Sequence, residues 1–517
     1  MEKYLMALDG GTSSFRAILF DLNGNQKYIE QVEWEHLNDP NIPGSMDFDY
    51  QNNWQLIRQC IRNVIEKNDI NSKNILALAT TTMREGFVLY DHNGQELIAF
   101  ANVDSRAVEE STYLKKNYPH LEKELYEVTG ESFALGALPR LLWVKHNRPD
   151  LMERSTQLSM LNDWISFKLS GKIAVEPSNA STTGLYNIIE NKWEYERLSE
   201  FGIQLEPTPI LESGSILGNV SKTVSEETGL STSTLVVMGG GDAQLGSLGV
   251  GSIHNHQATL LGGSFWQLEF NTTDFVNDTK GEARINRHAI PGFYQYELIS
   301  WMPGVVSSWI LDAFFDIDKE YAGNKKMAFK DIEEKASKVP IGSNGIITCS
   351  SNTMNMLNLN NCAPTFTNFN FDKEKCNRFT LFRSYMESVA YTVLGHKEKI
   401  EELSGQKISN MIFAGGASNN KLWCQILADV LNCEILVPVN KEATAFGAAL
   451  LASIGAGLFD SIEDAANLIE YEKTYYPNEL NHQEYQIYRN KWREVYLRQL
   501  ELSNQNITAS MWKAPGL

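Results

Sequence analysis

The first stretch of the chain that could do chemistry is a glycine turn between two short apolar runs. Its sequence, DGGTSSFR, contains Asp9, Gly10, Gly11, Thr12 and Arg16. We expect a tight hairpin whose two glycines adopt positive φ. Amides and a hydroxyl at the tip can bind phosphate oxygens, the carboxylate of Asp9 can hold Mg²⁺ directly or through water, and the guanidinium supplies fixed positive charge. A plain hairpin with a surface charge pair is the alternative for this stretch alone.

A second corner, GGGDAQLGSLGVG at residues 239–251, follows another apolar run and places six glycines around Asp242 and Gln244. So many glycines let the backbone approach a ligand closely. A carboxylate at this corner could accept the proton of a hydroxyl that attacks a γ-phosphate. The chain lacks G-x-x-x-x-G-K-[ST] and a helix-opening G-x-G-x-x-G, which disfavours a P-loop enzyme and a dinucleotide enzyme.

Two further turns of small residues follow apolar runs in the second half. One contains Gly262, Gly263 and Ser264, and the other, AGGASNN, contains Gly415, Gly416, Ala417 and Asn419. Small residues at a helix start let a flat ring or a phosphate lie against it, although an ordinary strand-to-helix turn would look the same. The Ala- and Gly-rich stretch EATAFGAALLASIGAG must pack very closely against a neighbour.

Polar residues that could recognise a substrate are concentrated in the first half. Carboxylates, amides and guanidinium groups together can bind the hydroxyls of a polyol or a carbonyl compound. The candidates for substrate binding are Arg84, Glu85, Asp104, Arg106, Asp163, Asn179 and, at the second glycine corner, Gln244. For Asp104 and Arg106, a purely structural ion pair remains open.

The elements that must position these residues alternate between strand-like and helix-like segments, which predicts an α/β fold with a mixed sheet. A helix should begin after Asp49, with apolar residues at helical spacing. The strand and glycine corner near residue 236, and the glycine turn after residue 258, echo the opening of the chain. We therefore expect two related domains, 1–252 and 253–457, and a helical extension, 458–517, packed on the second.

The composition excludes several classes of protein. The 517 residues include 45 basic and 64 acidic side chains, a net charge of −19, which disfavours a nucleic-acid partner. No run approaches the ~18 apolar residues of a membrane span, and we expect no signal peptide. Six scattered cysteines favour a reducing cytoplasm over a disulfide framework.

Four motifs, in order, carry a resemblance that covers nearly the whole chain. They are D-x-G-T-x-x-x-R, G-G-G-D-x-Q, A-G-G-A-S-N-N-x-L-W-x-Q-x-L-A-D and E-A-T-A-F-G-A-A. Together they resemble the FGGY carbohydrate kinases, a family that includes glycerol, xylulose and ribulose kinases. The resemblance implies a duplicated ribonuclease-H-like, actin-type fold with an interdomain cleft, which transfers phosphate from ATP with Mg²⁺ to a small polyhydroxylated substrate.

The resemblance also implies roles for individual residues. Asp242 would be the general base. The γ-phosphate and Mg²⁺ would be faced by Asp9, Gly11, Thr12 and Arg16, and the adenine nucleotide would be bordered by Gly415, Gly416, Ala417 and Asn419. The pair Arg84–Glu85 matches the pair with which glycerol kinases contact polyol hydroxyls. Where many relatives have Gly-Thr in the second phosphate turn, this chain has Gly-Gly-Ser, so either Ser264 supplies the hydroxyl or the amides act without one.

Alternatives to this interpretation remain open at the level of sequence. Within the family, the substrate could be a pentulose or glycerol. In another class, an actin-like protein could bind nucleotide without catalysis. Glycerol kinases of the family respond to sugar-phosphotransferase proteins, so a regulatory phosphocarrier partner is a further expectation. The oligomeric state is not indicated.

Overall fold

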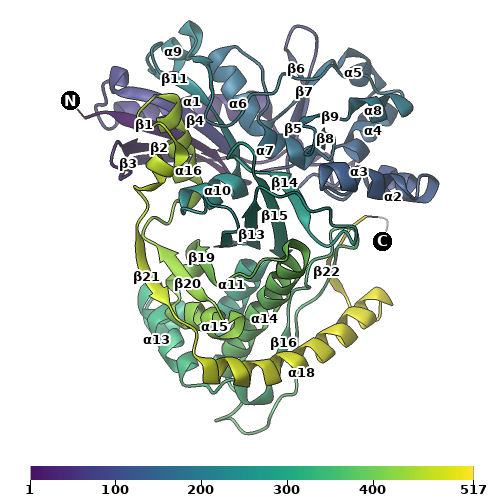
Figure 1. Ribbon diagram of the computed structural model, residues 1–517, viewed down its shortest axis with the longest axis vertical. Coiled ribbons are helices and arrows are strands. Elements are labelled where there is room, and N and C mark those ends of the chain that lie inside the picture. The colour runs from purple at the N-terminus through teal and green to yellow at the C-terminus, as the bar shows by residue number, and fades with distance from the viewer. Residues whose placement is uncertain (1, 516–517) are drawn as a thin grey trace.

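The computed structural model describes residues 2–515, apart from the side chains of residues 318 and 319, and contains two lobes, each built on a mixed sheet (Figure 1). The first sheet has the order β10-β11-β4-β1-β2-β3. Its strands are β1 (Tyr4–Gly10), β2 (Ser14–Asp21), β3 (Gln26–Glu33), β4 (Ile75–Thr82), β10 (Ile216–Asn219) and β11 (Leu235–Gly241).

The second sheet has the order β14-β15-β13-β12-β19-β20-β21. Its strands are β12 (Ala258–Gly262), β13 (Trp266–Thr272), β14 (Arg284–Arg287), β15 (Tyr294–Ser300), β19 (Asn410–Ala414), β20 (Glu434–Pro438) and β21 (Tyr471–Tyr475).

The two sheets share one topology. In the first, β3-β2-β1 are antiparallel neighbours, and β4 and β11 continue the sheet parallel to β1. In the second, β15-β13-β12 are antiparallel and β19 and β20 continue parallel to β12. This common order confirms the predicted duplicated α/β fold.

The opening hairpin forms as predicted, but for a different steric reason. The amide of Gly11 donates to the carbonyl of Ser14 at 2.9 Å. The expected positive φ at Gly10 and Gly11 is wrong, because neither is among the described residues with positive φ. A Cβ on Gly10 would instead lie 3.1 Å from both Thr82 Cγ2 and Trp34 Cη2. Gly10 is therefore needed for packing rather than for backbone conformation.

The predicted helix after Asp49 is α1 (Tyr50–Glu66), which packs on β2 and β3. The side chain of Asp49 caps it, accepting from the amide of Asn52 at 3.0 Å. Its buried face includes Ile57, Ile61 and Val64. Spacing and capping chemistry were therefore sufficient to locate this helix.

Helices α10 (Asp242–Gly249) and α16 (Ala443–Gly455) cross where the lobes meet (Figure 1). Although α16 follows a strand of the second sheet, it packs on β1, β4 and β11 of the first. A Cβ on Gly249 would lie 1.9 Å from the carbonyl oxygen of Ala443, and one on Gly447 would lie 2.0 Å from that of Leu245. The predicted close packing of the Ala- and Gly-rich helix is therefore confirmed.

The C-terminal segment contains more than a helix. Its helix α18 (Glu479–Asn504) packs on α14 (Arg378–Ser404) and α15 (Lys421–Leu431) of the second lobe. Strand β21 extends the second sheet, and β22 (Ser510–Lys513) pairs with β17 (Asn360–Cys362). The charged composition of this segment gave no sign of either strand.

The remaining elements surround the two sheets. A small sheet of the first lobe has the order β6-β5-β7. Its strands are β5 (Phe87–Tyr90), β6 (Glu96–Phe100) and β7 (Gln157–Met160). Several helices position side chains discussed below: α2 (Val108–Asn117), α3 (Leu121–Thr129), α4 (Leu138–Asn147), α6 (Leu161–Ser170), α7 (Pro177–Ala180), α11 (Pro303–Phe314) and α13 (Lys325–Ser337).

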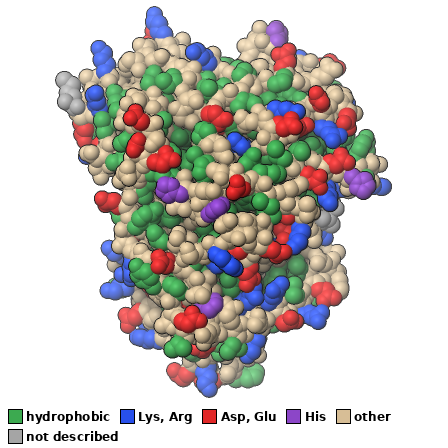
Figure 2. Space-filling view, viewed as in Figure 1, with side chains coloured by type: hydrophobic (Ala, Val, Ile, Leu, Met, Phe, Trp, Pro, Cys, Tyr) green, Lys and Arg blue, Asp and Glu red, His purple; other side chains and the backbone are tan. Residues whose placement is uncertain are grey.

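The remaining predictions from composition concern charge, cysteines and membranes. Acidic and basic side chains are interspersed over the face shown in Figure 2. All six cysteines are free thiols, and five are buried. Within the described part of the chain, no helix combines the length and apolar character needed to span a membrane.

Candidate active site

Asp242 lies at the first turn of α10, directly after β11. Its Oδ1 accepts from the amide of Ala243 at 2.8 Å and lies 3.1 Å from Nε of Arg84. The side chain is 42% exposed, so a ligand can reach it. Burial of the surrounding site raises the pKa of Asp242 to about 6, although the positive charge of Arg84 acts in the opposite direction. A carboxyl group with this pKa is suited to accept a proton near neutral pH.

Arg84 and Glu85 belong to the corner between β4 and β5, and both make ion pairs with the second lobe. Arg84 Nη1 lies 2.5 Å from Oε2 of Glu297 on β15. Arg284 on β14 places Nη2 2.7 Å from Oε1 of Glu85 and 2.6 Å from Oε2 of Glu131. These buried pairs join the lobes beside Asp242.

Two neighbouring carboxyl groups of this network, those of Glu297 and Glu269, have pKa values shifted in opposite directions. Burial acts to raise the pKa of Glu297, but the guanidinium groups of Arg84 and Arg284 outweigh it and lower that pKa to about 2. Glu269 is the cross-strand neighbour of Glu297 and is fully buried, and burial raises its pKa. Glu297 is therefore the ionised member of this pair of carboxyl groups.

The opening hairpin forms a second cluster of charges. Asp9, on β1, pairs with Nη2 of Arg16, and burial raises the pKa of this carboxyl group although Arg16 lowers it. Nη1 of Arg16 lies 2.5 Å from Oε2 of Glu442, the residue before α16. Thr12 is exposed at the tip, where its hydroxyl accepts from Asn102 Nδ2 at 3.2 Å. The sequence interpretation assigned no role to Glu442, although it begins the fourth motif.

The two small-residue turns of the second half line one cavity of about 420 Å³. Apolar side chains of α11 and α13, including Val305 and Phe329, form another part of its wall. A cavity of this kind can hold a flat ring against apolar groups while backbone amides contact phosphate oxygens. The predicted nucleotide residues that line it are Gly262, Gly263, Ser264, Gly416, Ala417 and Asn419.

Gly415 directly precedes the cavity-lining Gly416 and has a strict steric requirement. Its φ is +91°, and a Cβ there would lie 2.7 Å from the carbonyl oxygen of Gly262. Only glycine avoids both problems. Gly415 therefore brings the two turns together.

Asp104 and Arg106 form the structural ion pair that the sequence left open. Arg106 Nη2 lies 2.7 Å from Asp104 Oδ2 and also pairs with Asp47. The Arg106 guanidinium lies between the rings of Phe100 and Trp143, 4.9 and 4.8 Å from their centroids. The guanidinium of Arg106 is therefore fixed within the first lobe, shortly before the start of α2.

Asp163 and Asn179 are buried within the first lobe, which contradicts the expectation that they line the substrate pocket. Asn162 bridges them: its Nδ2 donates to Asp163 Oδ1 at 3.1 Å, and its Oδ1 accepts from Asn179 Nδ2 at 2.8 Å. Oδ1 of Asn179 accepts from the hydroxyl of Thr182 at 3.2 Å, and the oxygen of that hydroxyl accepts from the amide of Glu85 at 3.3 Å. Both side chains therefore support the corner of Glu85 from inside.

Gln244 is also fully buried, one turn into α10. Among the described residues, neither its Oε1 nor its Nε2 has a hydrogen-bond partner. Its predicted contact with substrate remains a prediction.

The acidic groups offer oxygen ligands for a hard cation, but no closed cage. Within residues 2–515, no group of three or more His, Cys, Asp or Glu side chains is arranged to hold a metal ion. Mg²⁺ is usually bound by one or two carboxylates together with substrate phosphates and water. The pair of Asp9 and Glu442, with the hydroxyl of Thr12 at the same turn, fits that mode of binding.

Three residues of the site were missed by the sequence interpretation: Glu131, Arg284 and Glu297. All three are fully or almost fully buried and make ion pairs between the lobes. Arg284 and Glu297 are neighbours on adjacent strands, and no local motif surrounds either of them. The only available signal was the charge of Glu297 in the middle of a buried strand, since Arg284 begins its strand and Glu131 lies outside any helix or strand.

Comparisons with known proteins agree with this arrangement. Residues 4–249 match the N-terminal domain of the FGGY family of carbohydrate kinases, and residues 275–456 match its C-terminal domain. An autoinducer-2 kinase from Salmonella paratyphi A is 43% identical over 99% of this chain and 98% of its own length.

Solved structures show the same fold at lower identity. A xylulose kinase from Rhodospirillum rubrum is 20% identical and has a TM-score of 0.83 over 97% of this chain and 99% of its own. A Plasmodium falciparum glycerol kinase with ADP, also 20% identical, has a TM-score of 0.81 over 96% of this chain and 98% of its own. The chain therefore belongs to the FGGY family of carbohydrate kinases.

Proposed function

We propose that this protein phosphorylates autoinducer-2, 4,5-dihydroxy-2,3-pentanedione, on its primary hydroxyl at C5, with ATP as the donor. The full-length similarity to autoinducer-2 kinases supports this choice of substrate. The reaction itself depends on one observation, the accessible carboxylate of Asp242 beside Arg84 at the start of α10.

In the proposed reaction, the substrate hydroxyl gives its proton to Asp242 as its oxygen attacks the γ-phosphorus of ATP. A new phosphorus–oxygen bond forms, the bond to the bridging oxygen breaks, and ADP leaves with the electron pair. Arg84 and Glu85 orient the neighbouring hydroxyl by donating to it and accepting from it. Because the network that holds both residues is buried, it keeps them in place without a large change in structure.

The donor nucleotide would lie in the 420 Å³ cavity of the second lobe, with its phosphates directed toward the glycine turns of both halves. Mg²⁺ would be held near Asp9, directly or through water, and would neutralise phosphate charge. Arg16 adds a fixed positive charge at the same turn. Ser264 is exposed on the cavity wall and can donate its hydroxyl to a phosphate oxygen.

An assay of ADP release with a panel of acceptors tests this function. We expect the highest kcat/KM with 4,5-dihydroxy-2,3-pentanedione, and lower values with xylulose, ribulose and glycerol. A higher value with a pentulose or glycerol would replace the proposed substrate and keep the reaction. Hydrolysis of ATP that does not depend on acceptor, or formation of filaments on sedimentation, would instead favour the non-catalytic actin-like alternative. Regulation by a phosphocarrier protein remains a prediction.

A further inference from the structure

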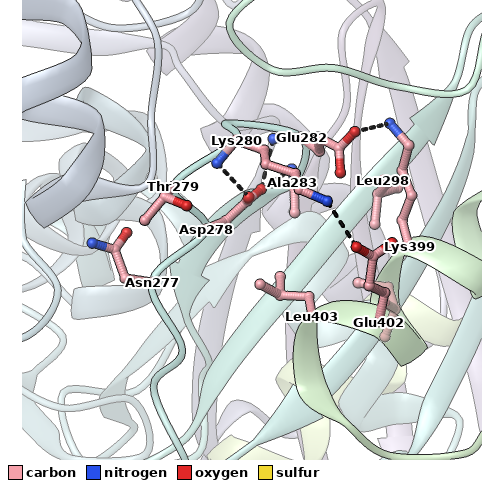
Figure 3. A pocket seen from close by; sticks show the side chains of 11 residues that line it. Asn277, Asp278, Thr279, Lys280, Glu282, Ala283, Leu298, Lys399, Glu402 and Leu403 are labelled. Atoms are coloured by element: carbon pink, nitrogen blue, oxygen red, sulfur yellow. Dashed lines mark hydrogen bonds and ion pairs between the residues drawn. The ribbon is translucent and has the colours of Figure 1, made fainter.

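Two surface cavities away from the nucleotide turns differ in whether their charges are paired. The first, of about 170 Å³, is lined by the loop before β14, by Leu298 of β15 and by α14, and is shown in Figure 3. There, Lys280 Nζ lies 2.7 Å from Glu402 Oε1, and Lys399 Nζ lies 3.1 Å from Glu282 Oε1. Because its lysines and glutamates neutralise one another, this cavity gives no indication of a ligand.

The second cavity, of about 210 Å³, lies between the two lobes at the C-terminal strand. The first lobe contributes the start of α2, the loop before α4, and Arg140 on α4. Trp512 and Lys513 of β22 form the opposite wall. In Figure 1, β22 runs from the end of α18 toward α2 and α3 of the first lobe.

Two polar groups that line this cavity are buried without a complete set of partners. Arg140 is 5% exposed; its Nη2 donates to the carbonyl of Leu135 at 2.9 Å, and its guanidinium lies 4.9 Å from the ring centroid of Phe87. Within residues 2–515, Nη1 of Arg140 and Oδ1 of Asp104 have no hydrogen-bond partner. The other carboxylate oxygen of Asp104 is occupied, by Arg106 and by the amide of Met46 at 2.7 Å.

Unpaired buried groups of this kind are costly and rare in native proteins. A donor and an acceptor on one small cavity offer complementary hydrogen bonds to a ligand that carries both a carbonyl and a hydroxyl. The guanidinium of Arg140 is also poorly compensated, since burial lowers its pKa although nearby carboxylates act to raise it. A neutral polar ligand that accepts a hydrogen bond would relieve this cost without adding charge.

One loop of the cavity wall directly follows a residue of the candidate active site in the chain. Glu131, which pairs with Arg284 and through it with Glu85, is followed by the loop that contributes Phe133 and Gly136 to the cavity wall. The negative charges of Glu85 and Glu131 both act on Arg140. Arg140 on the cavity wall is therefore close enough to Glu85 for their charges to interact.

We propose that this cavity is the subsite for the carbonyl-bearing end of the substrate, with Arg140 donating to a carbonyl oxygen and Asp104 accepting from a hydroxyl. The inference rests on the proposed function, which places the reacting hydroxyl at Asp242. Phe133, Pro139 and Trp512 provide apolar contact for the carbon chain. Because a hydroxyl oxygen also accepts hydrogen bonds, Arg140 discriminates a carbonyl substrate from the polyol of the same length through the planar geometry of the carbonyl group.

The C-terminal strand gives this subsite a wall from the second lobe. Trp512 stacks on Trp301, with their ring centroids 4.4 Å apart, and β22 is fixed to β17 by backbone pairing. The subsite is therefore complete only when β22 is in place. Substitution of Trp512 changes the subsite without disturbing the buried contacts of Arg140.

The test compares two acceptors on two enzymes. One acceptor is the best carbonyl substrate from the panel, and the other is the polyol obtained by reducing its carbonyl groups. We expect Arg140→Met to raise KM for the carbonyl substrate by roughly 10- to 100-fold, the range for loss of a hydrogen bond to a charged group, with a much smaller change for the polyol. Arg148→Met, at the exposed end of the same helix, is the matched control and should change neither value.

Trp512→Ala provides an independent variant if Arg140→Met does not fold. We expect a rise in KM for the carbonyl substrate with kcat reduced less than threefold, and unchanged affinity for ADP. In the full-length enzyme, Trp512→Phe should also abolish part of the fluorescence change caused by the carbonyl substrate alone. Equal losses with both acceptors in Arg140→Met, or unchanged KM in both folded variants, would refute the subsite.

The test of the subsite and the test of the proposed function can fail independently of each other. If the wild-type enzyme accepts a pentulose but not 4,5-dihydroxy-2,3-pentanedione, the proposed substrate fails. The subsite is then tested with that pentulose and its reduced polyol. If Arg140→Met loses the preference for the carbonyl acceptor, the subsite stands whichever substrate is preferred.

Discussion

The pKa of Asp242 sets an acid limit for the proposed reaction. Since the base must be ionised and its pKa is about 6, kcat/KM should be halved near pH 6 and fall about tenfold for each pH unit below it. Asp242→Asn removes the base, and we expect kcat to fall by roughly 10²- to 10⁴-fold at pH 7.5. ADP binding should be unchanged, because the nucleotide cavity lies on other residues.

The contact with Arg84 allows the same pKa to be moved. Arg84 Nε lies 3.1 Å from Asp242 Oδ1 and favours the ionised form. A neighbouring opposite charge lowers a carboxyl pKa by about 1–3 units. Because the Asp242 side chain is 42% exposed, solvent screening favours the lower end of this range. We therefore expect Arg84→Met to raise the acid limit by about one unit, toward pH 7.

The assay is initial-rate ADP release from pH 5 to 9, with kcat/KM reported so that the limit refers to the free enzyme. Arg84→Lys is the control, since it keeps a positive charge and should keep the limit near pH 6. A wild-type profile that stays flat down to pH 5 would refute the assignment of the base. Turnover of Asp242→Asn within a few fold of wild type would refute it independently.

Three further variants test the packing, the interlobe charges and the nucleotide turn. Gly447→Ala should lower the free energy of unfolding, measured by urea denaturation, by about 1–3 kcal/mol, because its Cβ would overlap the Leu245 carbonyl. The control is Gly416→Ala, where a Cβ has open space, and it should show no such loss of stability. Glu297→Gln should cost about 3–5 kcal/mol at pH 7, because it removes a buried carboxylate that pairs with both Arg84 and Arg284. In the folded wild-type protein the pKa of Glu297 is about 2, below its unfolded value, so the stability that Glu297 provides is present above pH 4.5 and is lost toward pH 2. If the difference in free energy of unfolding between wild type and Glu297→Gln does not become smaller from pH 4.5 to pH 2, this reasoning is contradicted. Gly415→Ala should weaken ADP binding on the order of tenfold through backbone strain, measured by calorimetry, and unchanged affinity would contradict the requirement for positive φ.

Local chemistry in the sequence was sufficient to predict the elements that carry short motifs. The hairpin, the helix capped by Asp49 and the two glycine turns all form where capping residues, glycines and apolar periodicity placed them. The close packing of α16 also followed from its composition, because a helix of alanine and glycine can be approached more closely than any other.

The site could be predicted only in part, because much of it depends on contacts between distant segments. Arg84 and Glu85 were identified, but their partners Glu297 and Arg284 lie about 200 residues later in the chain, on strands that carry no local motif. Asp163 was misassigned for the same reason. A polar residue after a strand can face the cleft or the interior, and only tertiary packing decides which.

The duplicated topology also explains why the chemistry is divided unequally between the halves. Asp9 lies near the end of β1 and pairs with Thr81 of β4; at the matching place in β12, Leu261 pairs with Ala414 of β19. The first half therefore keeps a carboxylate where the second has an apolar side chain.

The helices after the last shared strands retain more of the symmetry. Asp242 begins α10 after β11, and Glu442 directly precedes α16 after β20. Each carboxylate is held by an arginine of the first half, Arg84 or Arg16. Because α10 and α16 cross at glycines that admit no larger side chain, the starts of the two helices are fixed relative to each other. In the proposed reaction, the first half thus serves the acceptor and the metal and the second serves the nucleotide, and the crossing of the two helices aligns them.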